Sequence, residues 1–277
     1  MGIEPLQDYS RLCIHTMTTR PWAVEEAVAK YVAAGVGGIT IWREALEGRS
    51  PEAVGRMARD AGLTIVSLCR GGFFAHSREE ARRQAIDENR RAIDEAAALE
   101  TPLLVIVCGA DPDQSLETSR KQIRDGLGAI LPQAEEAGVR LGIEPLHPMY
   151  ADDRSAITTL KQANDMCAEL QSDLVGVIVD VYHLWWDPDL EGEIRRAGRE
   201  GSLAAFHICD WKTPTTDLLL DRGLMGEGCI PIRTIRGWVE DNGFTGFHEV
   251  EIFSKTYWES DQDEFLRQIM AAYLNHS

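Results

Sequence analysis

Basic residues are scarce in this 277-residue sequence. Lysine and arginine together number 28 against 45 aspartates and glutamates, which gives a formal net charge of −17. Proteins bind nucleic-acid backbones and anionic lipid surfaces through clustered lysine and arginine that release counterions. No such cluster interrupts the acidic balance. We therefore expect neither a nucleic acid nor a membrane surface as a partner.

Long apolar runs and paired cysteines are also missing. No apolar stretch approaches the roughly 18 residues of a membrane-spanning helix, and the first residues show no signal-peptide pattern. The six cysteines stand singly, without a C-x-x-C pair, which argues against a zinc or disulfide framework. Reduced thiols and a cytoplasmic location are expected.

Short apolar runs alternate with longer amphipathic runs along the whole chain. The apolar runs predict strands at residues 12–16, 38–42, 63–68, 103–107, 140–144, 175–179, 203–208 and 246–251. The amphipathic runs predict helices at residues 23–34, 51–61, 78–99, 116–137, 157–170, 189–197, 231–242 and 263–274. This is a pattern of eight strand–helix units.

Such alternation is compatible with a doubly wound sheet or with a closed (β/α)8 barrel. Eight units, and no G-x-G-x-x-G turn after the first strand, favour the barrel. No linker or low-complexity tract divides the chain. We expect the α/β class and a single (β/α)8 TIM-barrel domain over residues 1–277.

Polar side chains follow four consecutive predicted strands. Glu144, Asp180 and His207 stand at strand ends, and the last strand carries Glu249 and Glu251, which period-two alternation places on one face. Barrel active sites lie at the C-terminal ends of the strands. Three carboxylates converging there would repel one another without a cation. Such an oxygen-rich set with one imidazole suits one divalent ion, Mn²⁺, Mg²⁺ or Co²⁺, and could accept Zn²⁺ or Fe²⁺. The pattern leaves Glu249 and Glu251 as alternatives.

Several stretches resemble the xylose-isomerase-like TIM-barrel superfamily of sugar isomerases and epimerases, which includes ketose 3-epimerases and keto-inositol dehydratases. The matching stretches are GIEPLHP, VIVDVYHLWWDP, FHICDWKTP, DRGLMGEG and GFTGFHEVEIFS. The resemblance implies that one metal ion is held by Glu144, Asp180, His207 and Glu251. It also implies that Glu144 and Glu251 act as the acid/base pair and that His183 contacts the substrate. Arg222 resembles a loop arginine of the keto-inositol relatives.

Further polar and aromatic residues stand near the same strand ends. His147, three residues after Glu144, could be an additional catalytic base or could simply hydrogen-bond within its loop. Contacts with substrate hydroxyls, carboxylate or ring faces are expected from Glu44, Arg70, Asp210 and Trp211. An ion pair between Glu44 and Arg70, and lid or subunit packing of Trp211, are the alternatives.

The resemblance implies a metal-dependent isomerase or epimerase that removes a proton α to a carbonyl through a metal-stabilised enediolate. An unphosphorylated ketose or keto-sugar is expected, because FSKTYWES follows the last strand where phosphate-binding barrels have a glycine-rich turn. A lyase or dehydratase acting on keto-inositols or 3-keto-glycosides is the nearest alternative, and a non-catalytic sugar-binding or partner subunit is another. A homo-oligomer, dimer or tetramer, is plausible from the relatives.

Overall fold

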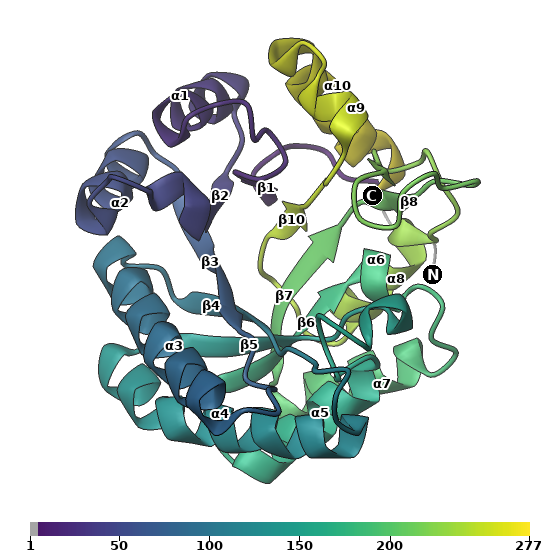
Figure 1. Cartoon of the computed structure of the whole chain (residues 1–277). Helices are drawn as coiled ribbons and strands as arrows, with labels where there is room; N and C mark the ends of the chain where they lie inside the picture. The colour runs from purple at the N-terminus through teal and green to yellow at the C-terminus, as the bar shows by residue number, and fades with distance from the viewer. Residues whose placement is uncertain (1–4) are drawn as a thin grey trace.

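Eight parallel strands close into a barrel in the computed structural model, which describes residues 5–277 (Figure 1). Around the barrel the order is β1, β10, β7, β6, β5, β4, β3, β2. These strands are β1 (Leu12–His15), β2 (Gly38–Trp42), β3 (Thr64–Gly72), β4 (Leu103–Val107), β5 (Arg140–Glu144), β6 (Val175–Asp180), β7 (Leu203–Ile208) and β10 (His248–Val250). The predicted (β/α)8 TIM barrel is confirmed.

Helices surround the barrel on its outer face (Figure 1). The long ones are α1 (Val24–Ala34), α2 (Pro51–Asp60), α3 (Glu79–Leu99), α4 (Leu116–Ala137), α5 (Leu160–Leu170), α7 (Leu190–Glu200), α8 (Ile232–Asp241) and α10 (Gln262–His276). Short elements follow the strand ends: η1 (Arg43–Leu46), η2 (Pro148–Tyr150), α6 (Val181–Leu184), α9 (Lys255–Trp258) and the hairpin of β8 (Asp210–Trp211) and β9 (Arg222–Gly223). The sequence did not predict these short elements.

Local signals explain where several helices begin and end. The Ser50 hydroxyl accepts a hydrogen bond from the Ala53 N–H, and Pro51 occupies the first helical position of α2. Gly35 and Gly138 follow α1 and α4 with φ of 79° and 67°, the left-handed conformation that terminates a helix. Each helix therefore turns directly into the next strand.

Strand β3 is longer than predicted, and this changes the position of Arg70. The strand continues to Gly72, which pairs with Val107 of β4 after a register shift between Cys69 and Gly71. Gly72 has φ of 111°, and a Cβ there would lie 1.8 Å from the Val107 carbonyl oxygen. Only glycine therefore allows β3 to approach β4 this closely. Arg70 therefore belongs to the strand and not to a loop after it.

The core consists of strand and helix side chains that are almost completely buried, from Leu12 of β1 to Tyr273 of α10. His248 points out of the barrel into this layer, and its imidazole contacts the Tyr273 hydroxyl at 2.9 Å. Among residues 5–277, none of the helices combines the length and apolarity needed to cross a membrane.

Candidate metal centre and cavity

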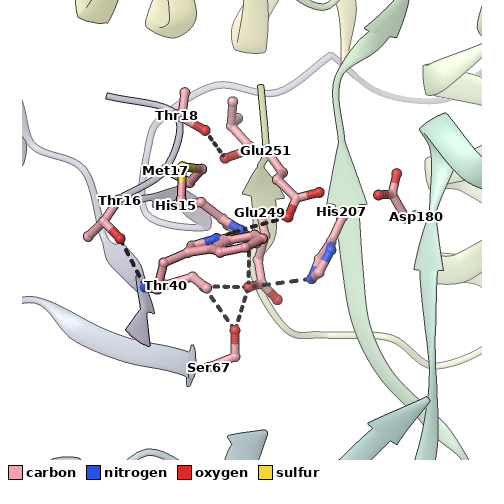
Figure 2. A network of polar contacts seen from close by, with 12 residues as sticks. His15, Thr16, Met17, Thr18, Thr40, Ser67, Asp180, His207, Glu249 and Glu251 are labelled. Atoms are coloured by element: carbon pink, nitrogen blue, oxygen red, sulfur yellow. Dashed lines mark hydrogen bonds and ion pairs between the residues drawn. The ribbon is translucent and has the colours of Figure 1, made fainter. Parts of the chain in front are cut away.

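The four side chains predicted to bind a metal lie together at the C-terminal end of the barrel. Glu144 and Asp180 are the last residues of β5 and β6, His207 lies near the end of β7, and Glu251 directly follows β10. These strands are consecutive around the barrel. One ligand atom from each residue lies within 4.8 Å of the others, and all four side chains are buried. Figure 2 shows Asp180, His207 and Glu251 near one another, with the His207 ring also facing Glu249.

Several polar atoms of this cluster have no hydrogen-bond partner although they are buried. They are Glu144 Oε1, Asp180 Oδ2 and both ring nitrogens of His207. Glu144 Oε1 and His207 Nδ1 are 3.0 Å apart without hydrogen-bond geometry, as expected for two atoms that face a common third. Buried polar groups normally have hydrogen-bond partners. Unpartnered carboxylate oxygens and imidazole nitrogens at this spacing are therefore suited to coordinate a divalent cation. The residues present therefore match a metal site in number and chemistry.

Burial and the neighbouring charges set the electrostatics of the cluster. Burial and the neighbouring Glu251 raise the pKa of Asp180, despite the opposing charge of Arg222. Burial alone would lower the pKa of His207, but Glu249 and Glu144 raise it to about 10. Protons and a divalent cation would compete for these ligand atoms, so metal binding to the cluster would depend on pH.

Arg222 of β9 reaches over the cluster from the hairpin. Its Nη1 lies 2.7 Å from Glu251 Oε2 and 3.6 Å from Asp180 Oδ2, and the side chain is 4% exposed. Its Nη2 lies 3.3 Å from Nε2 of His183. Burial and this arginine hold the pKa of His183 well below its usual range, so the imidazole is neutral. The His147 backbone N–H donates to His183 Nδ1 at 3.2 Å.

His15 belongs to the same polar network but was not among the predicted residues. It ends β1, with Nδ1 3.3 Å from Glu251 Oε1 and Nε2 3.3 Å from Glu249 Oε2 (Figure 2). The Trp42 indole N–H donates to His15 Nδ1 at 3.1 Å. The available signal was its place at the end of an apolar strand, the rule that identified the other four residues. Its ring bridges the two glutamates.

Glu249 lies one layer deeper in the barrel than Glu251. The hydroxyls of Thr40 and Ser67 donate to Glu249 Oε2 at 2.5 and 3.1 Å (Figure 2). Burial would raise the pKa of Glu249, but the His207 and His15 imidazoles lower it below its usual range. The four-residue metal-ligand group contains Glu251 and not Glu249. Both carboxylates face the barrel interior, but Glu249 approaches only His207 of the four, with Oε2 3.7 Å from Nε2.

A cavity of about 610 Å³ opens above the cluster. Of the predicted site residues, its lining contains Glu44, Arg70, Glu144, His183, Arg222 and Glu251. Apolar walls come from Trp42, Val107, Leu146, Phe253 and Trp258, among others. The cavity thus combines two carboxylates of the candidate metal cluster, cationic groups and aromatic surface in one space, as a small-molecule site does.

The other predicted contacts lie outside this lining. The His147 ring packs against Trp186 and Trp211, with centroids 5.7 and 5.2 Å away, and its Nδ1 accepts from the Met149 N–H. Trp211 stacks on Tyr182 at 4.9 Å. These side chains form a packed aromatic layer beside the cavity, which matches the packing alternative considered for Trp211.

Asp210 organises the loop between the hairpin and α8. Its carboxylate accepts from the backbone N–H groups of Gly226, Gly228 and Ile230 at 2.9–3.0 Å, and also from that of Trp211. The Asp210 carboxylate thus serves to hold this loop in place, and it does not line the cavity as a predicted substrate contact would. Glu44 and Arg70 form no ion pair with one another among the described contacts, and the Arg70 guanidinium lies over the Phe73 ring at 4.5 Å.

The chain matches the xylose isomerase-like TIM barrel family over residues 28–271. It belongs to this family. Inosose isomerase of Bacillus licheniformis is 23% identical over 206 residues, which cover 70% of this chain and 69% of that protein. Protein SMc04130 of Sinorhizobium meliloti 1021 is 44% identical with a TM-score of 0.92, covering 96% of this chain and 98% of that one.

A more distant solved structure of similar fold contains a metal. The crystal structure of IolI with a bound zinc atom has a TM-score of 0.82 and 20% identity, and it covers 95% of this chain and 96% of that one. At this identity the likeness concerns the fold.

Proposed function

We propose that this protein is a divalent-metal-dependent isomerase or epimerase of a keto-sugar without phosphate. The observation that carries the proposal is the buried cluster of Glu144, Asp180, His207 and Glu251, whose ligand atoms are partly unsatisfied and two of whose carboxylates, Glu144 and Glu251, line the cavity. A carboxylate cluster of this kind serves enolisation, because a metal and two acid/base groups are what the reaction requires.

The bound ion would polarise a substrate carbonyl and an adjacent hydroxyl, which makes the neighbouring C–H acidic. Glu144 and Glu251 come from strands on either side of β6 and β7 and both border the cavity. One carboxylate would take the α-proton and the other acid would return a proton to the opposite face. Return to the same carbon inverts it, and return to the adjacent carbon isomerises the sugar.

The chain's own side chains would orient the substrate. Arg222 and His183 form the wall beside the carboxylates, and both are buried and hydrogen-bonded to their surroundings. The arginine holds the pKa of Glu251 well below its usual range against the effect of burial, which keeps this carboxylate ionised. Preorganised charge of this kind needs no rearrangement when substrate arrives.

The names of relatives support the substrate class. Besides the inosose isomerase, similar folds belong to a D-psicose 3-epimerase (TM-score 0.78) and a 3-keto-D-glucoside 4-epimerase (TM-score 0.77). The ion is proposed to be Mn²⁺, Mg²⁺ or Co²⁺ from the three-oxygen, one-nitrogen donor set. Zn²⁺ is compatible with the same donors and is named for IolI.

The thiols favour a reducing compartment. All six cysteines are free, and five of them are buried. Persistent free thiols are typical of cytoplasmic proteins, and we propose that location.

The test combines metal analysis with isotope exchange. Wild type and Glu251→Gln would be assayed for bound metal and for turnover of D-fructose, D-psicose and scyllo-inosose in deuterium oxide with added Mn²⁺, Mg²⁺ or Co²⁺. We expect about one ion per wild-type chain and deuterium in the recovered sugar. Loss of an acid/base group should reduce turnover roughly 10²–10⁴-fold.

Glu259→Gln is the matched control, because Glu259 is exposed and lies eight positions further along the chain. It should retain metal and turnover. An enone absorbance without isomerised sugar would place the protein among lyases. No bound ion and no turnover with any of the three metals would overturn the proposal and favour a binding subunit.

A further inference from the structure

The cavity is cationic in a strongly acidic protein. The chain carries a formal net charge of −17, yet five arginines and three glutamates line the cavity. They are Arg20, Arg49, Arg70, Arg154, Arg222, Glu44, Glu144 and Glu251. Clefts whose charge opposes that of the whole molecule concentrate ligands of the opposite sign. This lining therefore points to an anionic ligand.

The arginines differ in whether a carboxylate already neutralises them. Arg222 is paired with Glu251, and Arg49 is paired with Glu25 at 2.7 Å. The nearest carboxylate to Arg154 is that of its sequence neighbour Asp153, at 4.0 Å. Within residues 5–277, Arg70 has no recorded carboxylate partner, although it is half-buried.

Aromatic rings hold the Arg70 guanidinium in place. Its central carbon lies 4.5 Å from the Phe73 ring centroid and 6.0 Å from that of Trp42. Contact with ring faces orients the guanidinium plane but does not consume its edge N–H donors. The protein alone does not neutralise the charge of this partly buried guanidinium or occupy its N–H donors. A bound anion would do both.

Arg70 lies across the barrel from His207 and nearer to Glu144, whose strand β5 is two strands from β3. In the closed strand order, β3 lies four strands from β7, so Arg70 and His207 come from opposite sides of the barrel (Figure 1). The same cavity borders Arg70 and the carboxylates of Glu144 and Glu251. A ligand with its reacting carbon at these carboxylates would extend across the barrel mouth toward Arg70.

We infer that Arg70 binds a carboxylate at the end of the substrate remote from the reacting carbon, so that the substrate is a keto-sugar acid. This inference rests on the proposed function and narrows its substrate class. The planar guanidinium matches a carboxylate through two parallel hydrogen bonds. Barrel phosphate sites use backbone N–H groups at a short helix after the last strands. Here bulky Ile252 and Phe253 follow β10, and α9 has four residues.

The test uses non-reacting ligands of one chain length. D-gluconate, D-glucitol and D-glucitol 6-phosphate would be titrated calorimetrically into the protein, with EDTA and separately with Mn²⁺. We expect D-gluconate to bind at least tenfold more tightly than D-glucitol under both conditions. Arg70→Gln should weaken the binding of D-gluconate about 10–100-fold, which is the range for hydrogen bonds between charged groups. The affinity for D-glucitol should stay unchanged.

Arg70→Lys keeps the charge but removes the two-donor edge, so it should give an intermediate loss and serves as the second variant if Arg70→Gln does not fold. Arg49→Gln is the matched control, since the Arg49 guanidinium is already paired with Glu25. It should retain the preference.

Two results would overturn the inference: a D-gluconate preference that survives Arg70→Gln, or no measurable D-gluconate binding. If D-glucitol 6-phosphate binds more tightly than D-gluconate and this binding depends on Arg70, the group that Arg70 binds is a phosphate and not a carboxylate. The Mn²⁺ titration separates this inference from the proposed function. Absence of Mn²⁺ binding alongside an Arg70-dependent preference would reject the metal-dependent mechanism but retain the anion site.

Discussion

Replacing Arg222 tests the electrostatics of the site, because this arginine is the principal cation facing the acidic cluster. Its side chain is 4% exposed and lies 2.7 Å from Glu251 Oε2 and 3.6 Å from Asp180 Oδ2. Its guanidinium also covers the Tyr182 ring at 4.3 Å. Arg222→Met would retain much of the apolar contact with the ring but remove the charge.

The magnitude follows from the burial of the partners. Opposite charges 4 Å apart attract by about 4 kcal/mol at an effective dielectric constant of about 20. Removing one partner of a buried ion pair costs about 3–5 kcal/mol, because the remaining charge is uncompensated. Burial already raises the pKa of Asp180, so that carboxylate can take up a proton and relieve part of the loss. We therefore expect a decrease of about 3 kcal/mol in the free energy of unfolding with EDTA.

A bound divalent cation would supply the missing charge. Urea unfolding followed by circular dichroism should therefore show a loss of only about 1 kcal/mol with excess Mn²⁺. Arg195→Met is the control, since Arg195 is 56% exposed and pairs with Glu191 on the surface. It should change stability by less than about 0.5 kcal/mol. A loss below about 1 kcal/mol with EDTA, or an equal loss with and without Mn²⁺, would refute the electrostatic argument.

Three further predictions follow from the described contacts. His147→Gln should alter kcat less than about threefold, because the ring packs against Trp186 and Trp211 outside the cavity; a loss above about 10²-fold in steady-state assays would instead identify a catalytic base. The hydrogen bond from His248, with the Arg11 charge, holds the pKa of Glu240 at about 2, below its ordinary 4.5. This stability is present above pH 4.5 and is lost as pH falls through about 2. Glu240→Gln should therefore cost about 1–2 kcal/mol at pH 7 after allowance for screening, and urea unfolding should show a difference below about 0.5 kcal/mol near pH 2. Cys229 is the exposed thiol, so DTNB should modify one thiol in the native chain and six after denaturation, and a second fast thiol would contradict the buried positions.

Local sequence patterns sufficed to predict the architecture and most residues of the candidate metal cluster. Apolar runs of strand length alternate with amphipathic runs of helix length. This alternation predicts the barrel, because each apolar strand must be covered by an amphipathic helix and by neighbouring strands. Glu144, Asp180 and His207 were accessible to the same reasoning, since the ends of parallel strands meet at one rim. The residue at the end of the first strand, His15, follows this rule too and could have been included.

Other features depended on contacts between distant segments. The alternation of β10 places Glu249 and Glu251 on one face, and only the closed barrel puts Glu251 at the level of the cluster and Glu249 beside Thr40 and Ser67. Arg70 stands on the strand because two glycines let β3 continue past the predicted end and pair with β4.

Loop paths decided the remaining positions. Arg222 reaches Glu251 because the hairpin of β8 and β9 folds back over the barrel, whereas His147 and Trp211 turn into an aromatic layer beside the cavity. Strand and helix periods are local properties of the chain and can be read from neighbouring residues. The direction of a loop side chain is set by packing against residues far away in the sequence, so it emerges only when the barrel closes.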